Sequence, residues 1–497
     1  MSFKKEQINI VWFKRDLRLS DNEAIFNAFQ TNKRTLFIYV FENLLIEDSH
    51  FSERHWNFIK ESIKDINEEL KRYNSKVLVI KSDIIATINQ LLNHYQINDV
   101  YSHQETGILI TYERDKAFKR YCNNNRINWH ENINNGVERE LKNRDNWFEN
   151  WNTYMQKPLF PFNPSEKQLI SIEEINLIES FFKLENLDTP IKSSFQKGGT
   201  KMAWKYANSF FNSRLKDYMF NISKPEASRT SCSRISPYLA WGNLSVREVY
   251  QKANTITTTY NSKRHLDAFI SRLRWQAHFI QKFEMEHTME ESSVNKGYHK
   301  LKKSISKSYQ IAWQNGKTGF PLVDASMRCL NETGYLNFRM RALVVSFFTH
   351  ILWQPWQEAT THLSSMFLDF EPGIHFPQLQ MQAGETGINN LRIYNPIKNG
   401  LVHDPDALFI KKWVPELYKL DPHFAHEPYL MTELEQQFYN FKLGIDYPYP
   451  IVDIKSNRKK ASDILWAMKN NNVVISENQR ILKKHTINDR KRMLKNT

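Results

Sequence analysis

Cysteine is scarce in this chain, and its spacing does not suit metal or disulfide chemistry. Only three cysteines occur among 497 residues, at Cys122, Cys232 and Cys329, and none forms a C-x-x-C pair. This pattern argues against a disulfide framework, a four-cysteine iron–sulfur cluster and a four-cysteine zinc site. We expect no metal site.

Long apolar segments are also absent. No run of about 18 apolar residues is present, and the N-terminus M-S-F-K-K-E-Q lacks the apolar core of a secretory signal. We therefore expect a cytoplasmic protein with no membrane partner. No G-x-G-x-x-G follows the first predicted strand, which argues against a dinucleotide site at that point.

Length and charge bound the remaining possibilities. A chain of 497 residues is too long for one hydrophobic core, so two or three domains are expected. The net charge of +14 favours a polyanionic partner such as nucleic acid, although AT-rich coding would also raise the lysine and asparagine content. Residues 455–497 carry twelve Lys/Arg against three Asp/Glu. A monomer is expected.

The N-terminal part alternates short apolar runs with amphipathic stretches. The runs predicted to be buried parallel strands are Ile8–Phe13, Leu36–Phe41, Val77–Ile80 and Asp99–His103. Segments between them, such as Glu53–Tyr73, are predicted helices. The alternation is typical of an α/β fold with a doubly wound parallel sheet, which we assign to residues 1–130.

The later parts of the chain have a different pattern. Residues 131–197 contain N-I-N-N-G and K-P-L-F-P-F-N-P-S and are interpreted as an interdomain connector. Residues 198–450 are almost wholly helical in periodicity and rich in Trp, Phe and Met, which predicts a larger all-helical domain. Residues 451–497 form a basic tail whose first part keeps the apolar rhythm of a docked helix.

Four ordered motifs resemble those of the photolyase/cryptochrome family, and together they cover nearly the whole chain. I-V-W-F-K-R-D-L-R-L-S-D-N-E-A (Ile10–Ala24) resembles the opening strand and loop, and Tyr101–Asp115 resembles a later strand and helix. S-C-S-R-I-S-P-Y-L-A-W-G-N-L-S (Ser231–Ser245) resembles the flavin-phosphate loop. F-I-K-K-W-V-P-E-L (Phe409–Leu417) resembles the closing helix. The chain is identified as a divergent, bacterial-type member without the iron–sulfur cluster of one branch.

The resemblance implies FAD bound in the helical domain. The phosphates would lie against a small-residue loop just before the predicted helix at Ser236, since helix starts offer free N–H groups to anions. The residues placed there are Tyr218, Cys232, Ser233, Arg234, Ile235 and Ser236. Cys232 stands where the family usually has threonine. On local sequence alone, a simple helix N-cap cluster is the alternative.

The same resemblance places charged residues beside the flavin ring. Arg341 and Asp369 match the family's Arg–Asp pair, which would put fixed positive charge near the ring; an ordinary ion pair is the alternative. Glu371 matches a second acid at the ring edge. His375 stands where bacterial photolyases have asparagine, and we expect it to titrate near neutral pH and donate a proton, with a core histidine as the alternative.

Departures from the family fall on the repair machinery. Trp275 occupies the position that stacks on the lesion, but Arg272 replaces the catalytic glutamate and Phe338 replaces an asparagine near the lesion. Arg272 can hydrogen-bond the damaged base or grip a phosphate. Trp356 matches one member of the family's electron relay. Leu379 and Met381 stand where the W-x-W of that relay would be.

The sequence does not decide which other residues carry electrons or contact DNA. The candidates for an alternative electron path are Trp313, Trp353, Tyr394 and Trp413, each of which can equally be a packing residue. The candidates for a basic rim around a DNA-binding cavity are Arg272, Arg392, Lys398, Lys411 and Lys412. The region around His103–Gly107 borders the family's antenna site, where a folate, deazaflavin or second flavin binds; the sequence does not identify the pigment.

Three functions are consistent with these residues. The leading hypothesis is an enzyme, a deoxyribodipyrimidine photolyase-type lyase that uses reduced FAD and light to repair a pyrimidine dimer or a 6-4 product in UV-damaged DNA. The alternative is a cryptochrome-like blue-light receptor that signals through flavin photoreduction. A nucleic-acid-binding scaffold without flavin is the third.

Overall fold

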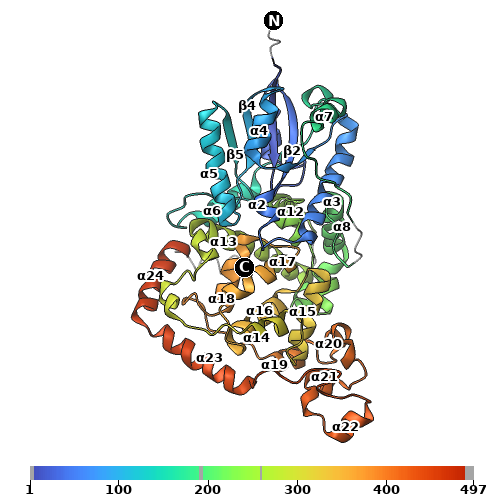
Figure 1. Cartoon of the computed structure of the whole chain (residues 1–497), viewed down its shortest axis with the longest axis vertical. Helices are drawn as coiled ribbons and strands as arrows, with labels where there is room; N and C mark the ends of the chain where they lie inside the picture. The colour runs from blue at the N-terminus through green and yellow to red at the C-terminus, as the bar shows by residue number, and fades with distance from the viewer. Residues whose placement is uncertain (1–4, 190–193, 258–259, 487–497) are drawn as a thin grey trace.

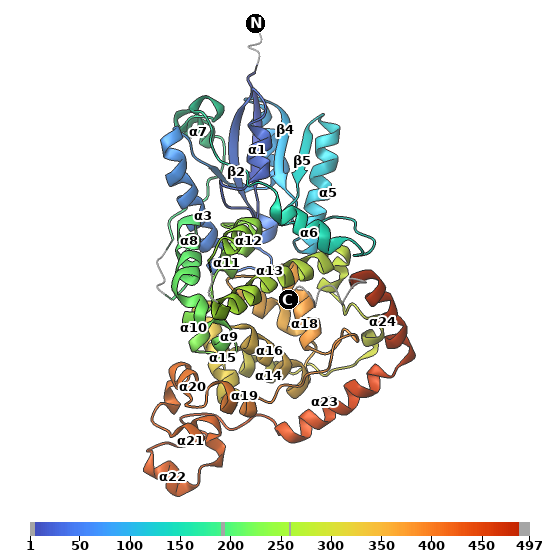
Figure 2. The ribbon, with the colours of Figure 1, turned by 180° about the vertical axis from the view of Figure 1, so that it is seen from behind.

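The computed structural model describes residues 5–189, 194–257 and 260–486. A sheet domain and a larger helical domain are stacked along the long axis of the molecule, with the N-terminus at the far end of the sheet (Figure 1). The reverse view shows the long helix α13 (Tyr260–Met285) crossing the helical domain just below the sheet domain (Figure 2). This arrangement confirms the predicted fold class.

Five parallel strands form the sheet in the order β3-β2-β1-β4-β5. Their bounds are β1 (Gln7–Phe13), β2 (Arg34–Glu42), β3 (Leu78–Ser82), β4 (Gln96–His103) and β5 (Asn128–Asn132). In the register, Ile10 pairs with Leu36 of β2 and with Val100 of β4. The sequence predicted four of these strands. It missed β5, an edge strand of sequence N-W-H-E-N that lacks an apolar run.

Helices cover both faces of the sheet, as a doubly wound fold requires. They are α1 (Glu23–Ala28), α2 (Asn43–Ile46), α3 (Glu53–Leu70), α4 (Ile84–Leu92) and α5 (Leu109–Asn124). Side chains of β1 alternate between two cores: Ile10 and Trp12 pack in the core that includes α4 and α5, whereas Val11 and Phe13 pack in the one that includes α1 and α3. The predicted helix Glu53–Tyr73 is α3 followed by one 3₁₀ turn.

The remaining chain is helical. Two helices, α6 (Trp147–Gln156) and α7 (Ile172–Glu179), lie within the predicted connector. The other helices are α8 (Thr200–Ser209), α9 (Tyr218–Asn221), α10 (Ala227–Ser231), α11 (Ser236–Ala240), α12 (Val246–Asn254), α13, α14 (Lys307–Gln314), α15 (Pro321–Thr333), α16 (Phe338–Ser346), α17 (Gln357–Met366), α18 (Pro372–Gln382), α19 (Pro396–His403), α20 (Leu408–Trp413), α21 (Pro422–His426), α22 (Glu433–Phe438), α23 (Ile454–Lys469) and α24 (Asn472–His485). Among the described helices, none has the length and apolar character needed to cross a membrane.

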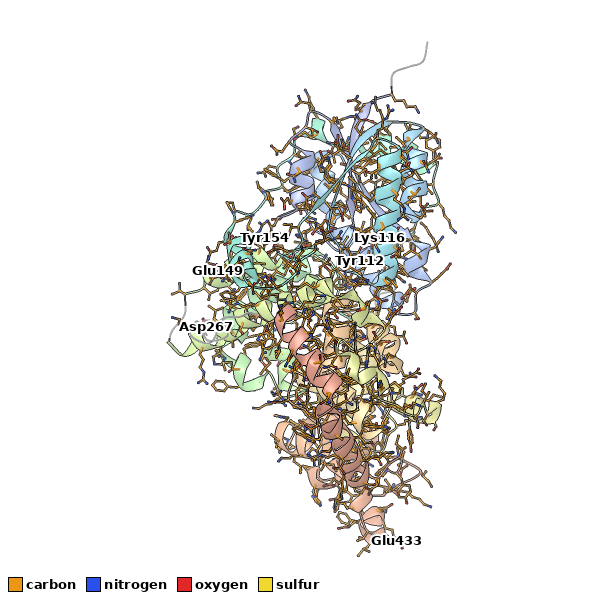
Figure 3. All side chains as sticks on the ribbon, turned by 90° about the vertical axis from the view of Figure 1, so that its left-hand side faces the viewer. Tyr112, Lys116, Glu149, Tyr154, Asp267 and Glu433 are labelled. Atoms are coloured by element: carbon orange, nitrogen blue, oxygen red, sulfur yellow. The ribbon has the colours of Figure 1, made fainter. Side chains whose placement is uncertain are left out.

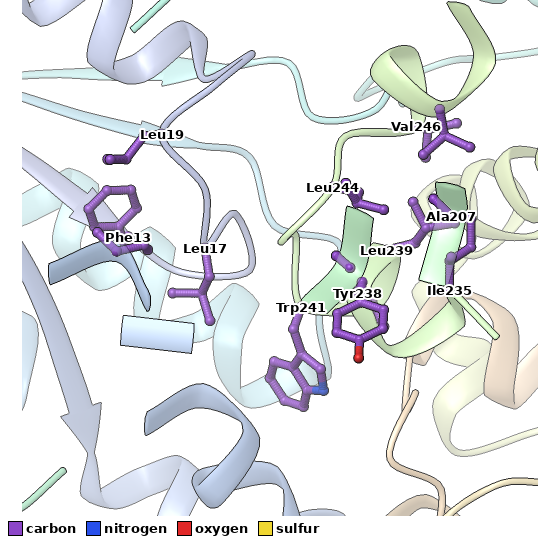
Figure 4. Packing of buried hydrophobic residues seen from close by; sticks show 14 of the residues in the cluster. Phe13, Leu17, Leu19, Ala207, Ile235, Tyr238, Leu239, Trp241, Leu244 and Val246 are labelled. Carbon is purple, nitrogen blue, oxygen red and sulfur yellow. The ribbon is translucent and has the colours of Figure 1, made fainter. Parts of the chain in front are cut away.

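One hydrophobic core joins the two domains. Phe13, Leu17 and Leu19 from the start of the chain face Tyr238, Trp241 and their neighbours in the helical domain (Figure 4). The backbone N–H of Leu17 donates to the Trp241 carbonyl at 3.2 Å. Gly242 (φ +76°) permits this close approach, because a Cβ there would lie 2.3 Å from the Arg15 carbonyl oxygen. The loop after β1 therefore serves as the interdomain joint.

A buried histidine in the helical domain predicts acid sensitivity. His350 lies fully buried between the Ser346 hydroxyl (2.9 Å) and the Ala383 carbonyl (3.0 Å). Burial lowers its pKa from 6.5 to about 3, so the unfolded chain binds a proton that the folded protein does not. Stability should be full above about pH 6.5 and fall as the pH drops toward about 3.

We expect the thermal midpoint to decrease steadily on acidification from about pH 7 to 5, and the variant His350→Gln to show a shallower decrease. Burial lowers the pKa of His55 to about 4 as well, so the variant should keep part of the slope. Thermal unfolding followed by circular dichroism at several pH values checks this. An identical slope in the two proteins would contradict it.

Candidate functional site

The predicted Arg–Asp pair forms in the centre of the helical domain. Arg341 on α16 donates from Nη2 to both carboxylate oxygens of Asp369, at 2.7 and 2.9 Å, and from Nε to the Leu336 carbonyl. Asp369 is 5% exposed, whereas Arg341 keeps 28% of its side chain accessible. The neighbours Met340 and Ala342 are buried. The guanidinium is therefore held by the carboxylate and packs on the Phe367 ring at 4.0 Å, while part of the side chain remains accessible.

Glu371 lies on the domain joint. Its carboxylate is 3.8 Å from the Arg15 guanidinium, which also stacks on Trp241 at 4.4 Å and donates to the Ala240 carbonyl. Burial raises the pKa of Glu371. Arg15 comes from the loop after β1, more than 350 residues earlier in the sequence, so the sequence offered no signal for this pairing beyond the Arg-Asp-Leu-Arg motif itself.

His375 is held as a neutral ring. Its Nε2 donates to the Thr360 carbonyl at 3.1 Å, and the rings of Phe370 and Phe376 lie edge-on at 5.2 and 5.3 Å. Burial lowers the pKa of His375 to about 3. The expectation of titration near neutral pH is therefore wrong. At neutral pH the imidazole ring is uncharged, and its Nε2 proton is hydrogen-bonded to a backbone carbonyl.

The predicted phosphate loop connects α10 and α11. Arg214 donates to the backbone carbonyl oxygens of Thr230 (3.1 Å) and Cys232. Both carbonyls therefore point toward the Arg214 guanidinium. No described residue accepts a hydrogen bond from the backbone N–H groups of Ser233, Arg234 or Ile235. Arg234 adopts a left-handed conformation (φ +61°), and its Nε is buried without a partner. Ser236 begins α11, as predicted.

Tyr335 links this loop to the Arg–Asp pair. The Arg234 guanidinium stacks on its ring at 3.8 Å, and the Arg341 guanidinium lies 6.0 Å from the same ring. Tyr335 is buried, and burial raises its pKa. The unpaired N–H groups of the loop and the accessible guanidinium therefore belong to one site. Sequence reasoning missed Tyr335 and Arg214, because each acts on residues distant in the chain.

The predicted lesion-facing residues are accessible to solvent. On α13, Trp275 is 49% exposed and Arg272 is also exposed; Phe338, the first residue of α16, is 51% exposed. Arg272 lies beside the buried Tyr218 of α9. Just after α9, the Ile222 carbonyl accepts from Asn337 at 3.1 Å. The α9 segment therefore bridges α13 and α16 and brings these residues to one region of the surface.

The Trp275 ring has a rigid support that the sequence did not indicate. His278 contacts it edge-on at 5.9 Å, and Phe279 lies at 6.0 Å. The Nδ1 atom of His278 accepts from the buried Arg144 guanidinium at 2.7 Å. Burial lowers the pKa of His278 well below its usual range, which is consistent with a neutral acceptor. The exposed Trp275 ring is therefore held in place by His278 and Phe279, and His278 is itself fixed by Arg144.

Only part of the family's tryptophan electron relay is present in this chain. Trp356 is fully buried, and its indole N–H donates to the Ser293 hydroxyl at 3.0 Å. Leu379 is buried on α18. Trp313 is packed against Phe348 at 4.5 Å and donates to the Val344 carbonyl, so it has a structural role. An alternative electron path stays a prediction.

The strand ends near His103–Gly107 are filled by charged groups. Arg114 contacts Glu42 and Glu105, each at 2.6 Å, and Lys14 contacts Asp115 at 3.3 Å; all five are buried. The space remaining among them is about 30 Å³. An antenna pigment at these strand ends stays a prediction.

Comparison with known proteins connects this geometry to a family. The family profile described as DNA photolyase matches residues 9–137, and the profile described as the FAD binding domain of DNA photolyase matches residues 269–467. The chain belongs to the photolyase/cryptochrome family. Together, these two profiles include most of β1 with the joint loop, Arg272, Trp275 and the Arg341–Asp369 pair.

Relatives of both functional types resemble the full chain. A deoxyribodipyrimidine photo-lyase of Alkalihalophilus pseudofirmus is 26% identical over 92% of this chain and 97% of its own length. A cryptochrome DASH of Synechocystis sp. is 27% identical over 89% and 95%. The crystal structure of a Synechocystis sp. cryptochrome has a TM-score of 0.82 at 22% identity and covers 93% of this chain and 100% of its own. A class III photolyase from Agrobacterium tumefaciens has a TM-score of 0.80, also at 22% identity, over 95% and 99%.

FAD is the cofactor of this helical domain, and the residues present fit it. An anionic dinucleotide needs donors for its phosphates and a polar partner for its ring. The loop 233–235 supplies unpaired N–H groups, and Arg234 contributes a buried Nε without a partner. The accessible side of Arg341 supplies a charged donor. The loop N–H groups and Arg234 Nε are thus free to bind an anionic ligand.

Proposed function

We propose that the protein is a light-driven DNA-repair enzyme that acts on a pyrimidine dimer or a 6-4 product. The observation that carries the proposal is the placement of an exposed, rigidly supported Trp275, together with Arg272 and Phe338, at the surface bridged by α9, with the flavin-binding residues in the same domain. The net charge of +14 favours a DNA partner. One curated relative carries the name deoxyribodipyrimidine photo-lyase.

In the proposed mechanism, bound FAD supplies an electron under light, and the chain's own residues position the reactants. Arg341, fixed by Asp369, would hold positive charge beside the ring of a bound flavin. Trp275 and Phe338 stack on the flipped bases of the lesion. Arg272 replaces the family's glutamate with a permanently charged donor, which hydrogen-bonds either a base oxygen or a phosphate. His375 contributes a neutral ring and no mobile proton.

A direct repair test uses photoreduced protein and two oligonucleotides, one with a cyclobutane dimer and one with a 6-4 product. Repair of either substrate would identify the lesion and would show that Arg272 serves in place of glutamate. Failure on both substrates, with FAD bound and reduced, would contradict the proposal.

Replacement of Trp275 by alanine should weaken binding of lesion DNA roughly 5- to 150-fold, because a base–aromatic stack contributes about 1–3 kcal/mol. Fluorescence anisotropy with a labelled lesion oligonucleotide measures this change. Phe181→Ala is a matched control, since Phe181 is exposed to a similar extent (47%) but lies just after α7. Equal losses in the two variants would show that Trp275 has no specific role.

A blue-light receptor is the second candidate. Three departures from the family support it: Arg272, Phe338, and the absence of tryptophan at Leu379 and Met381. This function predicts a partner that binds only the illuminated protein. Identical hydrodynamic behaviour and partner binding in darkness and light would argue against it. The match to a flavin-binding domain argues against the third hypothesis, a scaffold without flavin.

A further inference from the structure

Two surfaces of the helical domain lie outside the proposed site and have complementary charge. The first, which we call the acidic lobe, consists of residues 418–450 and contains α21 and α22. It projects from the base of the molecule in both ribbon views (Figures 1 and 2), and Figure 3 shows Glu433 at the end of the molecule farthest from the sheet. The lobe carries five Asp/Glu against two Lys, although the whole chain is strongly basic.

The acidic lobe exposes large apolar side chains. Leu434 and Phe438 are four residues apart and share one face of α22, where they are 75% and 80% exposed. Leu430, four residues before Leu434, is also exposed. The carboxylates of Glu433 and Glu435 lie on the same short helix. A helix with an apolar stripe and flanking carboxylates is the form of a segment that docks into a groove.

The second surface is a groove of about 470 Å³ between α23 and the loop 391–395. This size is within the range of about 300–1,000 Å³ that is usual for binding sites. Its apolar lining is Leu391, Ile393, Ile454 and Trp466. Leu391, Ile393 and Asn395 line the groove on the side opposite α23.

The edge of this groove is cationic. Lys455, Arg458 and Lys459 line it, with Asp463 as the single carboxylate among the lining residues. Within the described residues, no ion pair joins those three cations to an Asp or Glu. In α23 as a whole, five Lys/Arg face one Asp. The groove therefore offers apolar contact and unpaired positive charge, which is the complement of the acidic lobe.

The acidic lobe does not fill the groove of its own chain. The Tyr447 hydroxyl bonds to the buried Asp324 of α15, and the Ile451 N–H donates to the Thr318 carbonyl at 3.0 Å. These contacts fix the end of the lobe and the residue after it to α15 and to the loop that precedes α15, while Leu434 and Phe438 remain in solvent. We propose that the occupant of the groove is the α22 stripe of a second copy of this chain.

Such a contact is heterologous, because it pairs two different surfaces of identical chains. It therefore leaves a free lobe at one end and a free groove at the other, and it leads to rings or open chains of copies. A single short helix in one groove is a small interface, so the association is weak and concentration-dependent. Because charges at the rim steer the encounter, added salt weakens it. This differs from the monomer that the sequence suggested.

Sedimentation velocity of the full-length holoprotein at increasing concentration tests the proposal. The wild type should show a growing average mass. Phe438→Glu in the lobe and Lys459→Glu in the groove should each reduce self-association; for Phe438 we expect a loss of roughly 30-fold, the value for an aromatic anchor worth about 2 kcal/mol. Leu177→Glu, at an exposed position (70%) on α7, is the matched control and should behave as the wild type.

Mixing the two defective variants gives the decisive result. The Lys459→Glu protein keeps an intact lobe and the Phe438→Glu protein an intact groove, so the mixture should form a dimer that grows no further. FAD content and thermal midpoint verify that each variant is folded. A wild type that stays monomeric at every concentration, or a mixture that stays monomeric, would overturn the proposal. So would a Lys459→Glu variant that self-associates normally but no longer binds a single-stranded oligonucleotide.

Discussion

Replacement of Arg341 by methionine is expected to abolish stable FAD binding. The substitution removes the accessible charged donor at the flavin site and leaves Asp369, which is 5% exposed, without its cation. Breaking a buried ion pair by removing one partner destabilises a protein by about 3–5 kcal/mol, because the remaining charge is uncompensated. The absorbance ratio of flavin to protein after gel filtration measures the loss.

Two further variants separate the role of Arg341 from general damage. Arg339→Met changes an arginine only two residues away that contacts the Ser223 hydroxyl at 3.5 Å, and it should retain FAD. Asp369→Asn keeps the side-chain volume and should retain part of the FAD. Stoichiometric and normally photoreducible FAD in Arg341→Met would show that the pair is only structural.

Loss of the ion pair at the domain joint is expected to produce the largest change in stability. Asp21, from the loop after β1, accepts from Arg247 of α12, and both side chains are 2% exposed. The Arg247 guanidinium also stacks on Tyr154 at 4.8 Å and on Phe160 at 5.0 Å. We expect Arg247→Met to lower the free energy of unfolding by about 3–5 kcal/mol, because the buried Asp21 carboxylate loses its cation and keeps only the neutral donors Ser245 Oγ and Phe160 N–H.

Urea unfolding followed by both circular dichroism and flavin fluorescence measures this effect, since a two-domain chain can unfold in more than one step. The double variant Asp21→Asn with Arg247→Met is the control. It removes both charges and should recover part of the lost stability, which a simple packing defect would not. A single variant with an unchanged midpoint would show that the pair contributes little.

Local sequence patterns were sufficient for most of the fold. The strands β1, β2 and β3 contain buried apolar runs and β4 is buried over its last four residues, so short runs located them; the amphipathic period placed the helix Glu53–Tyr73. The edge strand β5 was missed because only Trp129 and Asn132 of its five residues are buried. The predicted boundaries of the interdomain connector (131–197) and of the basic tail (451–497) stay predictions.

Motif matching identified residues but not their environments. The Arg341–Asp369 pair, which the family resemblance implied, forms in the structure at 2.7 Å, and it gives the charge in an apolar helix the partner that it requires. The pKa of His375 could not be predicted by matching a motif. It depends on burial between Phe370 and Phe376 and on the Thr360 carbonyl, none of which a spacing encodes.

The sequence by itself determined the family, the α/β and helical architecture, and the identity of the charged pair. Each of these depends on residues close together in the chain or on a fixed motif. Only the tertiary structure decided which distant groups meet: Arg15 with Glu371, Tyr335 between Arg234 and Arg341, Arg144 behind Trp275. It also decided which apolar residues stay in solvent, as Leu434 and Phe438 do. Burial and long-range contact are properties of the packed chain, and the physical chemistry of the site follows from them.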